Sequence, residues 1–198
     1  MEGSTKRRRR HYQLGRRAET TEETKRRLVE ATFQLHSEQG IAGTTMKDIA
    51  ARAGVSVGTV YHHFPTYVDA IHACGAWVAE HEPAPSAAVF EGAATPAERV
   101  RRLAQAMFAF YERVPAIRSL HRDRQLIQEL GPFADAEARN RRALAEGAVG
   151  VEGPAALLAA LLDIEVYRAL KREGFSTAEA AERLAALINR SLESTAGA

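Results

Sequence analysis

Residues 44–64, TTMKDIAARAGVSVGTVYHHF, hold the side chains with the clearest chemistry. Two short stretches with helical apolar spacing are separated by Ala53-Gly54-Val55, which is typical of two helices joined by a tight turn. The second stretch begins with the short side chains of residues 56–59, which would let a helix lie deep in a DNA major groove with its positive dipole end toward phosphates. The segment therefore predicts a helix-turn-helix, although a helical hairpin that binds nothing has much the same pattern.

The local packing of this segment follows from the same residues. Ile49 and Ala50 are expected to face Val55 and Val60 in a small core, and Gly54 permits the sharp turn. This core would leave the polar N-terminal face of the second helix free.

The elements around this segment are expected to be helices as well. The chain has 198 residues, 45% apolar and 26% charged, enough for one two-part domain or two small ones around real cores. Alanine and leucine contribute 54 residues against 19 for valine and isoleucine, which favours an all-α fold. About nine helices are predicted, at 20–39, 46–52, 56–62, 66–82, 96–113, 116–130, 134–147, 154–173 and 177–193.

Five of these helices have a start signal in the sequence. A Thr or Ser is followed three positions later by an acid, which is the pattern of an N-terminal capping box. The pairs are Thr20 with Glu23, Thr45 with Asp48, Thr66 with Asp69, Thr95 with Glu98, and Ser176 with Glu179.

Charge is distributed unevenly along the chain. Residues 1–63 carry 12 Lys and Arg against 7 acids, a net charge of +5, whereas residues 64–198 carry 15 against 18, a net charge of −3. The first 17 residues alone contribute +6 and have no helical apolar face, so they are predicted to be a flexible basic arm. A solvated tail without a partner would have the same composition.

Several other classes of protein are disfavoured. One cysteine, Cys74, excludes an internal disulfide framework and fits a reducing compartment, and no apolar run approaches the ~18 residues of a membrane span. No phosphate-binding glycine loop, nucleophile elbow or H-E-x-x-H pair is present, so we expect no enzyme, no catalytic residue and no cofactor. His72 and Cys74 diverge on one helix, so no metal site is expected either.

The order of residues resembles the DNA-binding domain of the tetracycline-repressor (TetR) family of bacterial regulators. The matching residues span about 20–71 and include Leu28-Val29-Glu30-Ala31, Gly40, Thr44-Thr45, Asp48-Ile49-Ala50, Ala53-Gly54-Val55-Ser56, Gly58-Thr59 and Tyr61-His62-His63-Phe64. The resemblance implies a helix-turn-helix DNA-binding domain at 18–65, preceded by the arm at 1–17 and followed by a helical ligand-binding and dimerisation domain at 66–198. It also implies a bacterial, cytoplasmic protein that is associated with the nucleoid when bound to DNA.

By the same resemblance, particular residues are expected to contact DNA. Phosphate contacts are expected from polar side chains at the helix starts and at the end of the second helix, and base contacts from the three residues after Ser56. The predicted set is Thr44, Thr45, Lys47, Ser56, Val57, Gly58, Thr59, Tyr61 and His62.

Three positions depart from the family pattern. Tyr67 stands where a phosphate-binding lysine is common, His36 where the first helix usually buries a Phe, and Val57 where a basic residue is frequent. Fewer phosphate contacts are therefore expected from the domain itself. The arm is expected to compensate along the adjacent minor groove or backbone, through Arg7, Arg8, Arg9 and Arg10.

The larger half is expected to hold a small-molecule pocket and a dimer interface. Spacing alone favours plain core for its aromatic residues, whereas the resemblance favours a pocket for a largely apolar inducer. The candidate pocket residues are Trp77, Met107, Phe108, Tyr111, His121, Gln125, Phe133 and Leu161. The candidate dimer residues, on two apolar helices that would form a four-helix bundle with a second copy, are Leu158, Leu162, Val166, Leu184 and Ile188.

These expectations combine into one function. The sequence predicts a homodimer that binds a palindromic operator in double-stranded DNA and is released by a small molecule, with no membrane partner. A transcriptional activator, or an architectural binder that uses the arm without sequence preference, stays open as an alternative.

Overall fold

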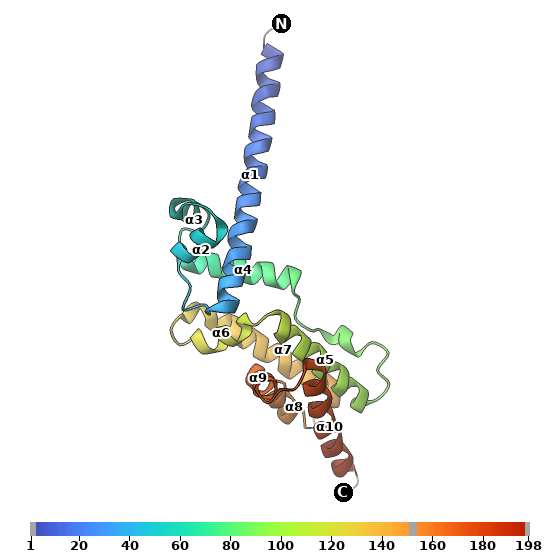
Figure 1. Cartoon of the computed structure of the whole chain (residues 1–198). Coiled ribbons are helices and arrows are strands. Elements are labelled where there is room, and N and C mark those ends of the chain that lie inside the picture. Colours follow the sequence, from blue (N-terminus) through green and yellow to red (C-terminus); the bar gives the residue numbers. More distant parts are fainter. Residues whose placement is uncertain (1–2, 151–153, 197–198) are drawn as a thin grey trace. The chain divides into compact units, whose positions relative to one another are not determined.

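The computed structural model describes residues 3–150 and 154–196, and the side chains of residues 20–150 and 154–193; over these ranges all regular secondary structure is helical (Figure 1). The all-α prediction is confirmed, with ten α-helices described where about nine were expected. Their bounds are α1 Gly3–Glu38, α2 Met46–Ala53, α3 Val57–His63, α4 Tyr67–His81, α5 Pro96–Arg113, α6 Ala116–Asp123, α7 Gly131–Val149, α8 Ala155–Leu161, α9 Ile164–Arg172 and α10 Thr177–Ala196. Two 3-10 turns, η1 Ala87–Phe90 and η2 Gln128–Leu130, complete them.

The chain divides into two compact units, with the division after Val78 inside α4. The sequence placed the boundary at 65/66. The first turns of α4 belong with the N-terminal unit because Ala70 is buried in its core and Tyr67 and Trp77 pack against that core.

The first helix begins earlier than the sequence suggested. Residues 3–17, predicted as a flexible arm, belong to α1, so the expected N-cap at Thr20 is wrong. The Thr20 carbonyl accepts a hydrogen bond from Thr24 Oγ1 at 2.8 Å inside the helix, and Glu23 pairs with Arg26 at 2.7 Å. The arm lacks an apolar face, but six of its 17 residues are Arg, a good helix former, and it has no proline.

The other capping boxes confirm the predicted helix starts. Thr45 and Asp48 exchange hydrogen bonds at 3.2 and 2.9 Å, and the pairs at Thr66 and Ser176 do the same. At α5 the box is half formed: the Glu98 N–H donates to Thr95, but the Glu98 carboxylate accepts from the Ala94 N–H at 3.0 Å.

The predicted helix at 154–173 is interrupted. Asp163 has extended backbone and caps α9 by accepting from the Glu165 N–H at 2.9 Å, so α8 ends before it. Arg141 of α7 pairs with the same carboxylate at 3.1 Å and stabilises the break. Likewise, the helix predicted at 116–130 ends at Asp123, and a 3-10 turn follows at 128–130.

Helix α5 is central to the second unit, where it packs against α7 and α10 (Figure 1). The buried side chains of α5 and of α10 recur with the 3.6-residue spacing of an amphipathic helix. They include Val100, Leu103, Ala104, Met107, Phe108 and Tyr111 on α5, and Ala181, Leu184, Ala185 and Ile188 on α10.

Candidate nucleic-acid interface and ligand pocket

Helices α2 and α3 form the predicted helix-turn-helix. Ile49 and Val60 are fully buried in the core of the first unit, and Val55 packs against that core, as expected. Gly54 takes the left-handed conformation, with φ of 66°, and caps α2. Because the turn and the core fix both helices, the direction of α3 is determined by residues outside its exposed face.

The exposed face of α3 begins at its N-cap. The Ser56 hydroxyl oxygen accepts from the Thr59 N–H at 3.1 Å and lies 2.9 Å from the Thr59 hydroxyl. Tyr61 is 51% exposed and His62 is exposed as well, whereas Val57 is half-buried against the core. The face thus offers short polar groups at the helix start and two aromatic rings a turn later.

Gly58 lies in the first turn of α3 without an internal reason to be glycine. A Cβ there would have one neighbour within 4 Å, Ser56 Oγ at 3.7 Å, an ordinary contact. Glycine in a helix costs about 0.5–1 kcal/mol relative to alanine. A glycine that the fold does not require is expected where another backbone or a ligand approaches closely.

The residues predicted to contact DNA at the start of α2 differ in availability. Thr44 is buried and donates to the Gly40 carbonyl at 2.8 Å, so its side chain belongs to the fold and its predicted DNA contact is corrected. The Thr45 hydroxyl donates to Asp48 Oδ2 at 2.7 Å, and the Thr45 hydroxyl and N–H together hold the pKa of that carboxyl below its ordinary value. Lys47 is exposed.

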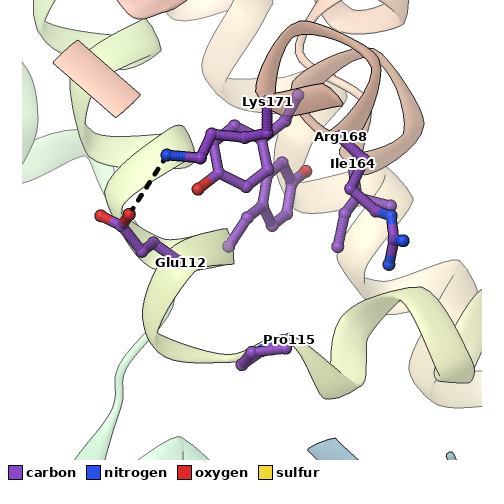
Figure 2. A pocket seen from close by; sticks show the side chains of 7 residues that line it. Glu112, Pro115, Ile164, Arg168 and Lys171 are labelled. Carbon is purple, nitrogen blue, oxygen red and sulfur yellow. Dashed lines mark ion pairs between the residues drawn. The ribbon is translucent and has the colours of Figure 1, made fainter. Parts of the chain in front are cut away.

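A pocket of about 280 Å³ lies in the second unit, between the end of α5 and α9 (Figure 2). Glu112 and Lys171 lie on one side of it and Arg168 on the other. Its lining residues are Tyr111, Glu112, Pro115, Ile164, Tyr167, Arg168 and Lys171.

A buried polar cluster adjoins this pocket through Tyr111. The Tyr111 hydroxyl lies 3.0 Å from both Glu137 Oε1 and the Leu162 carbonyl, and His121 Nε2 lies 2.9 Å from Glu137 Oε2. Burial opposes ionisation of Glu137, but the hydrogen bond of His121, the charge of Arg141 and the Tyr111 hydroxyl together hold its pKa below the ordinary value. The cluster ties α5, α6 and α7 to the α8–α9 break.

Comparison with known proteins identifies the first unit. Residues 28–66 match the family of bacterial regulatory proteins described as the tetR family. The tetR-family match thus covers the helix-turn-helix formed by α2 and α3. The HTH-type transcriptional regulator CymR of Pseudomonas putida is 38% identical over 63 residues, 32% of this chain and 31% of that protein. The HTH-type transcriptional regulator TtgR, also of Pseudomonas putida, is 36% identical over 58 residues, 29% and 28% of the two chains. This chain therefore matches about a third of the length of these curated relatives.

Solved structures extend the similarity over the second unit. A TetR-like transcriptional regulator from Rhodococcus sp. RHA1 has a TM-score of 0.65 at 20% identity, over 86% of this chain and 96% of that one. The multidrug binding protein EbrR, solved in complex with imidazole, has a TM-score of 0.56 at 25% identity, over 83% and 94% of the two chains. The helical fold of these two proteins is thus shared over most of this chain.

Two departures from the tetR-family pattern are linked in the structure. His36 is buried, and its Nε2 lies 2.9 Å from the Tyr67 hydroxyl, which donates to the Ile41 carbonyl at 2.5 Å. Since Tyr67 gives its one proton to Ile41, His36 must donate from Nε2. Tyr67, which stands where the family often has a lysine, therefore accepts the hydrogen bond of His36, which stands where the family usually has a phenylalanine.

The predicted pocket residues are largely elsewhere. Tyr111 lines the pocket, but Trp77 belongs to the first unit, where its ring is tilted at 45° to that of Phe33 with ring centroids 5.2 Å apart. Met107 and Phe108 are buried in the core, and Leu161 is half-buried outside the lining. His121 binds Glu137, while Gln125 and Phe133 are exposed. The residues of α9 were missed because the pocket depends on the helix break at Asp163.

Most of the predicted dimer residues lie inside the second unit. Leu158, Leu162, Leu184 and Ile188 are buried within the second unit, and Val166 is half-buried. Since α8 and α10 turn these faces inward, the large apolar side chains that they expose, among those the structure describes, are Leu157 and Leu187, 48% and 51% exposed.

Neither a metal-binding cluster nor a membrane-spanning helix occurs among the described residues. No three His, Cys, Asp or Glu side chains there converge on one point. No helix in these ranges is long and apolar enough to cross a lipid bilayer.

Proposed function

We propose that this chain is a ligand-responsive transcriptional regulator, a repressor that binds a palindromic operator as a homodimer and is released by a small molecule. The main support is the exposed N-terminal face of α3, which belongs to a helix-turn-helix that matches the tetR family. On this face Gly58 leaves room for the DNA backbone or a base to approach closely. In this proposal Ser56, Thr59 and the α3 N-terminus contact DNA in the major groove. Tyr61, His62 and Lys47 contact phosphates.

Dimerisation supplies the second half of the site. Two recognition helices about one DNA turn apart (~34 Å) read the two halves of a palindrome. Leu157 and Leu187 provide exposed apolar surface on α8 and α10 for a symmetric contact between copies. Because the partner of such a protein is chromosomal DNA, its place of action is the bacterial cytoplasm.

The ligand acts through the second unit. The pocket between α5 and α9 receives the inducer, and the complex of EbrR with imidazole shows that a protein of related fold binds a small molecule. Helix α4 belongs in part to each unit, so it is the element through which the pocket influences α3. A ligand lowers DNA affinity by its differential affinity for the DNA-competent and released states.

Selection of bound fragments from random double-stranded DNA tests this function, followed by a screen for small molecules that release the selected site. We expect one palindromic sequence to be enriched and at least one ligand to weaken its binding tenfold or more. Enrichment without sequence preference would contradict the proposal and favour an architectural binder. If no small molecule releases the protein from the selected site, the proposed regulation by a ligand would be contradicted.

A further inference from the structure

The pocket wall contains a cation whose hydrogen bonding is incomplete. Arg168 Nε is buried and has no hydrogen-bond partner, and among the described residues no carboxylate lies within ion-pair distance of its guanidinium. Burial, together with the nearby charges of Arg118 and Arg172, lowers the pKa of Arg168. A buried donor without an acceptor is costly, so this wall favours a ligand that supplies one.

The acids around Arg168 are already engaged. Glu165 pairs with Arg118 at 3.3 Å, and Asp123 pairs with Arg122 at 2.6 Å. Arg168 therefore adds positive charge to the pocket wall that these acids do not balance.

Glu112, the acid that lines the pocket, is also occupied. Its Oε1 accepts from the Thr177 hydroxyl at 2.7 Å and lies 3.7 Å from Lys171 Nζ. Besides this long contact with Glu112, Lys171 Nζ makes another long contact, 3.4 Å from Thr177 Oγ1. Lys171 is thus loosely held, one helical turn from Arg168 on α9.

The remaining lining offers apolar surface and few polar groups. Pro115 and Ile164 are aliphatic, and both tyrosines have their hydroxyls engaged outside the pocket. Tyr111 binds Glu137 and the Leu162 carbonyl, and Tyr167 lies 3.2 Å from Thr177 Oγ1. Recognition in this pocket therefore combines aromatic and aliphatic contact with positive charge (Figure 2).

We propose that the pocket binds a small amphiphilic anion, a carboxylate or phosphate monoester on an aromatic or short aliphatic body, whose charged group is received by Arg168. Lys171 adds its positive field at the rim, and the tyrosine rings with Ile164 contact the body of the ligand. A volume of about 280 Å³ fits a small ligand. This inference rests on the proposed function, because it names the chemical class of the inducer.

Calorimetric titration of the full-length protein tests the charge requirement. The probes are 2-naphthoate, 2-naphthyl phosphate and octanoate, with 2-naphthamide and octanamide as neutral matches. We expect at least one anion to bind ten times more tightly than its neutral match, and the two naphthyl anions to show whether carboxylate or phosphate is preferred. Equal affinity for anions and amides, or no saturable binding of any anion, would overturn the proposal.

Substitution on α9 tests the residue. Arg168→Gln is expected to weaken binding of the preferred anion at least tenfold, about 1.4 kcal/mol, and to leave amide binding unchanged. Arg172→Gln, on the same helix but outside the lining, is the matched control and should change neither. Lys171→Gln is a second variant with a smaller expected loss, should Arg168→Gln not fold. Equal losses in the Arg168 and Arg172 variants would overturn the assignment.

The two proposals fail in different ways. Anion binding in calorimetry needs no DNA, so absence of a selected operator would contradict the regulator and leave the pocket assignment standing. Conversely, if an operator is selected but the pocket does not prefer anions over amides, only the proposed chemical class of the ligand would be contradicted.

Discussion

At the scale of single residues, the glycine in the first turn of α3 carries the argument for an external partner. The fold leaves space for a side chain at Gly58, since one atom, Ser56 Oγ at 3.7 Å, would contact an added Cβ. A DNA surface against the helix would fill that space. At this position alanine would therefore favour the stability of the fold, whereas glycine would favour DNA binding.

Gly58→Ala is expected to stabilise the folded protein by about 0.5–1 kcal/mol, because alanine loses less backbone entropy in a helix. The same change is expected to weaken operator binding at least tenfold through contact of the new methyl group with DNA. Urea unfolding and fluorescence anisotropy measure the two effects. Gly131→Ala, at the open start of α7, is the control and should leave DNA affinity unchanged. Unchanged operator affinity in the α3 variant would contradict the placement of DNA.

A second residue-scale prediction concerns His36 and Tyr67. Tyr67→Phe removes the acceptor of His36 Nε2–H and the donor to the Ile41 carbonyl, so we expect a loss of about 1–3 kcal/mol in unfolding free energy. Combined with His36→Phe, the loss should be smaller than the sum of the two single losses, since no histidine donor is left unsatisfied. Additive losses in urea unfolding would show that the two side chains act independently.

At the scale of elements, the DNA-binding half was easier to predict from sequence than the rest. The turn at Gly54 and the packing of Ile49 on Val60 are local, since they lie within twelve residues of one another. The pocket, by contrast, depends on the break at Asp163, which a contact with Arg141 from α7 stabilises. Periodicity along residues 154–173 carries no signal of that tertiary contact.

In the N-terminal segment the sequence pattern predicted too little helix, whereas at residues 154–173 it predicted too much. Its charge pattern indicated a flexible arm, and its helix-forming residues extend α1 to Gly3 instead. Charge remains the basis of its proposed role, since residues 1–17 contribute +6 to a half that otherwise sums to −1.

Deletion of residues 2–17 is expected to lower operator affinity and to flatten its salt dependence. Each lost phosphate contact reduces the slope of log affinity against log salt by about 0.9, and we expect a change of at least about 2. Anisotropy at several salt concentrations measures the slope, with thermal unfolding as a control for the fold. An unchanged slope would contradict a role for Arg7 to Arg10 on DNA.

At the scale of the whole molecule, the net charge of +2 is a sum of unlike parts. The half from residue 64 onward sums to −3, so non-specific attraction to DNA is confined to the N-terminal half. In the proposed function, sequence-specific binding further requires a second copy of the recognition helix. The second unit is then expected to contribute to DNA binding through assembly.

Assembly is expected to depend on the exposed apolar residues of α8 and α10. The paired change Leu157→Glu with Leu187→Glu should convert the dimer to a monomer at micromolar concentration, because two like charges per copy would be buried in a symmetric contact. Leu126→Glu, an exposed leucine in the turn after α6, is the control and should leave the dimer intact. Sedimentation measures both. A variant that stays dimeric would place the interface elsewhere.

A footprint of the purified protein on the DNA that flanks its own gene tests the proposed function most directly. We expect protection of one discrete, two-fold symmetric site with half-sites about one helical turn (~34 Å) apart, and loss of that protection in Gly58→Ala. Uniform coverage of the fragment, or no protection at concentrations where the protein is dimeric, would contradict it.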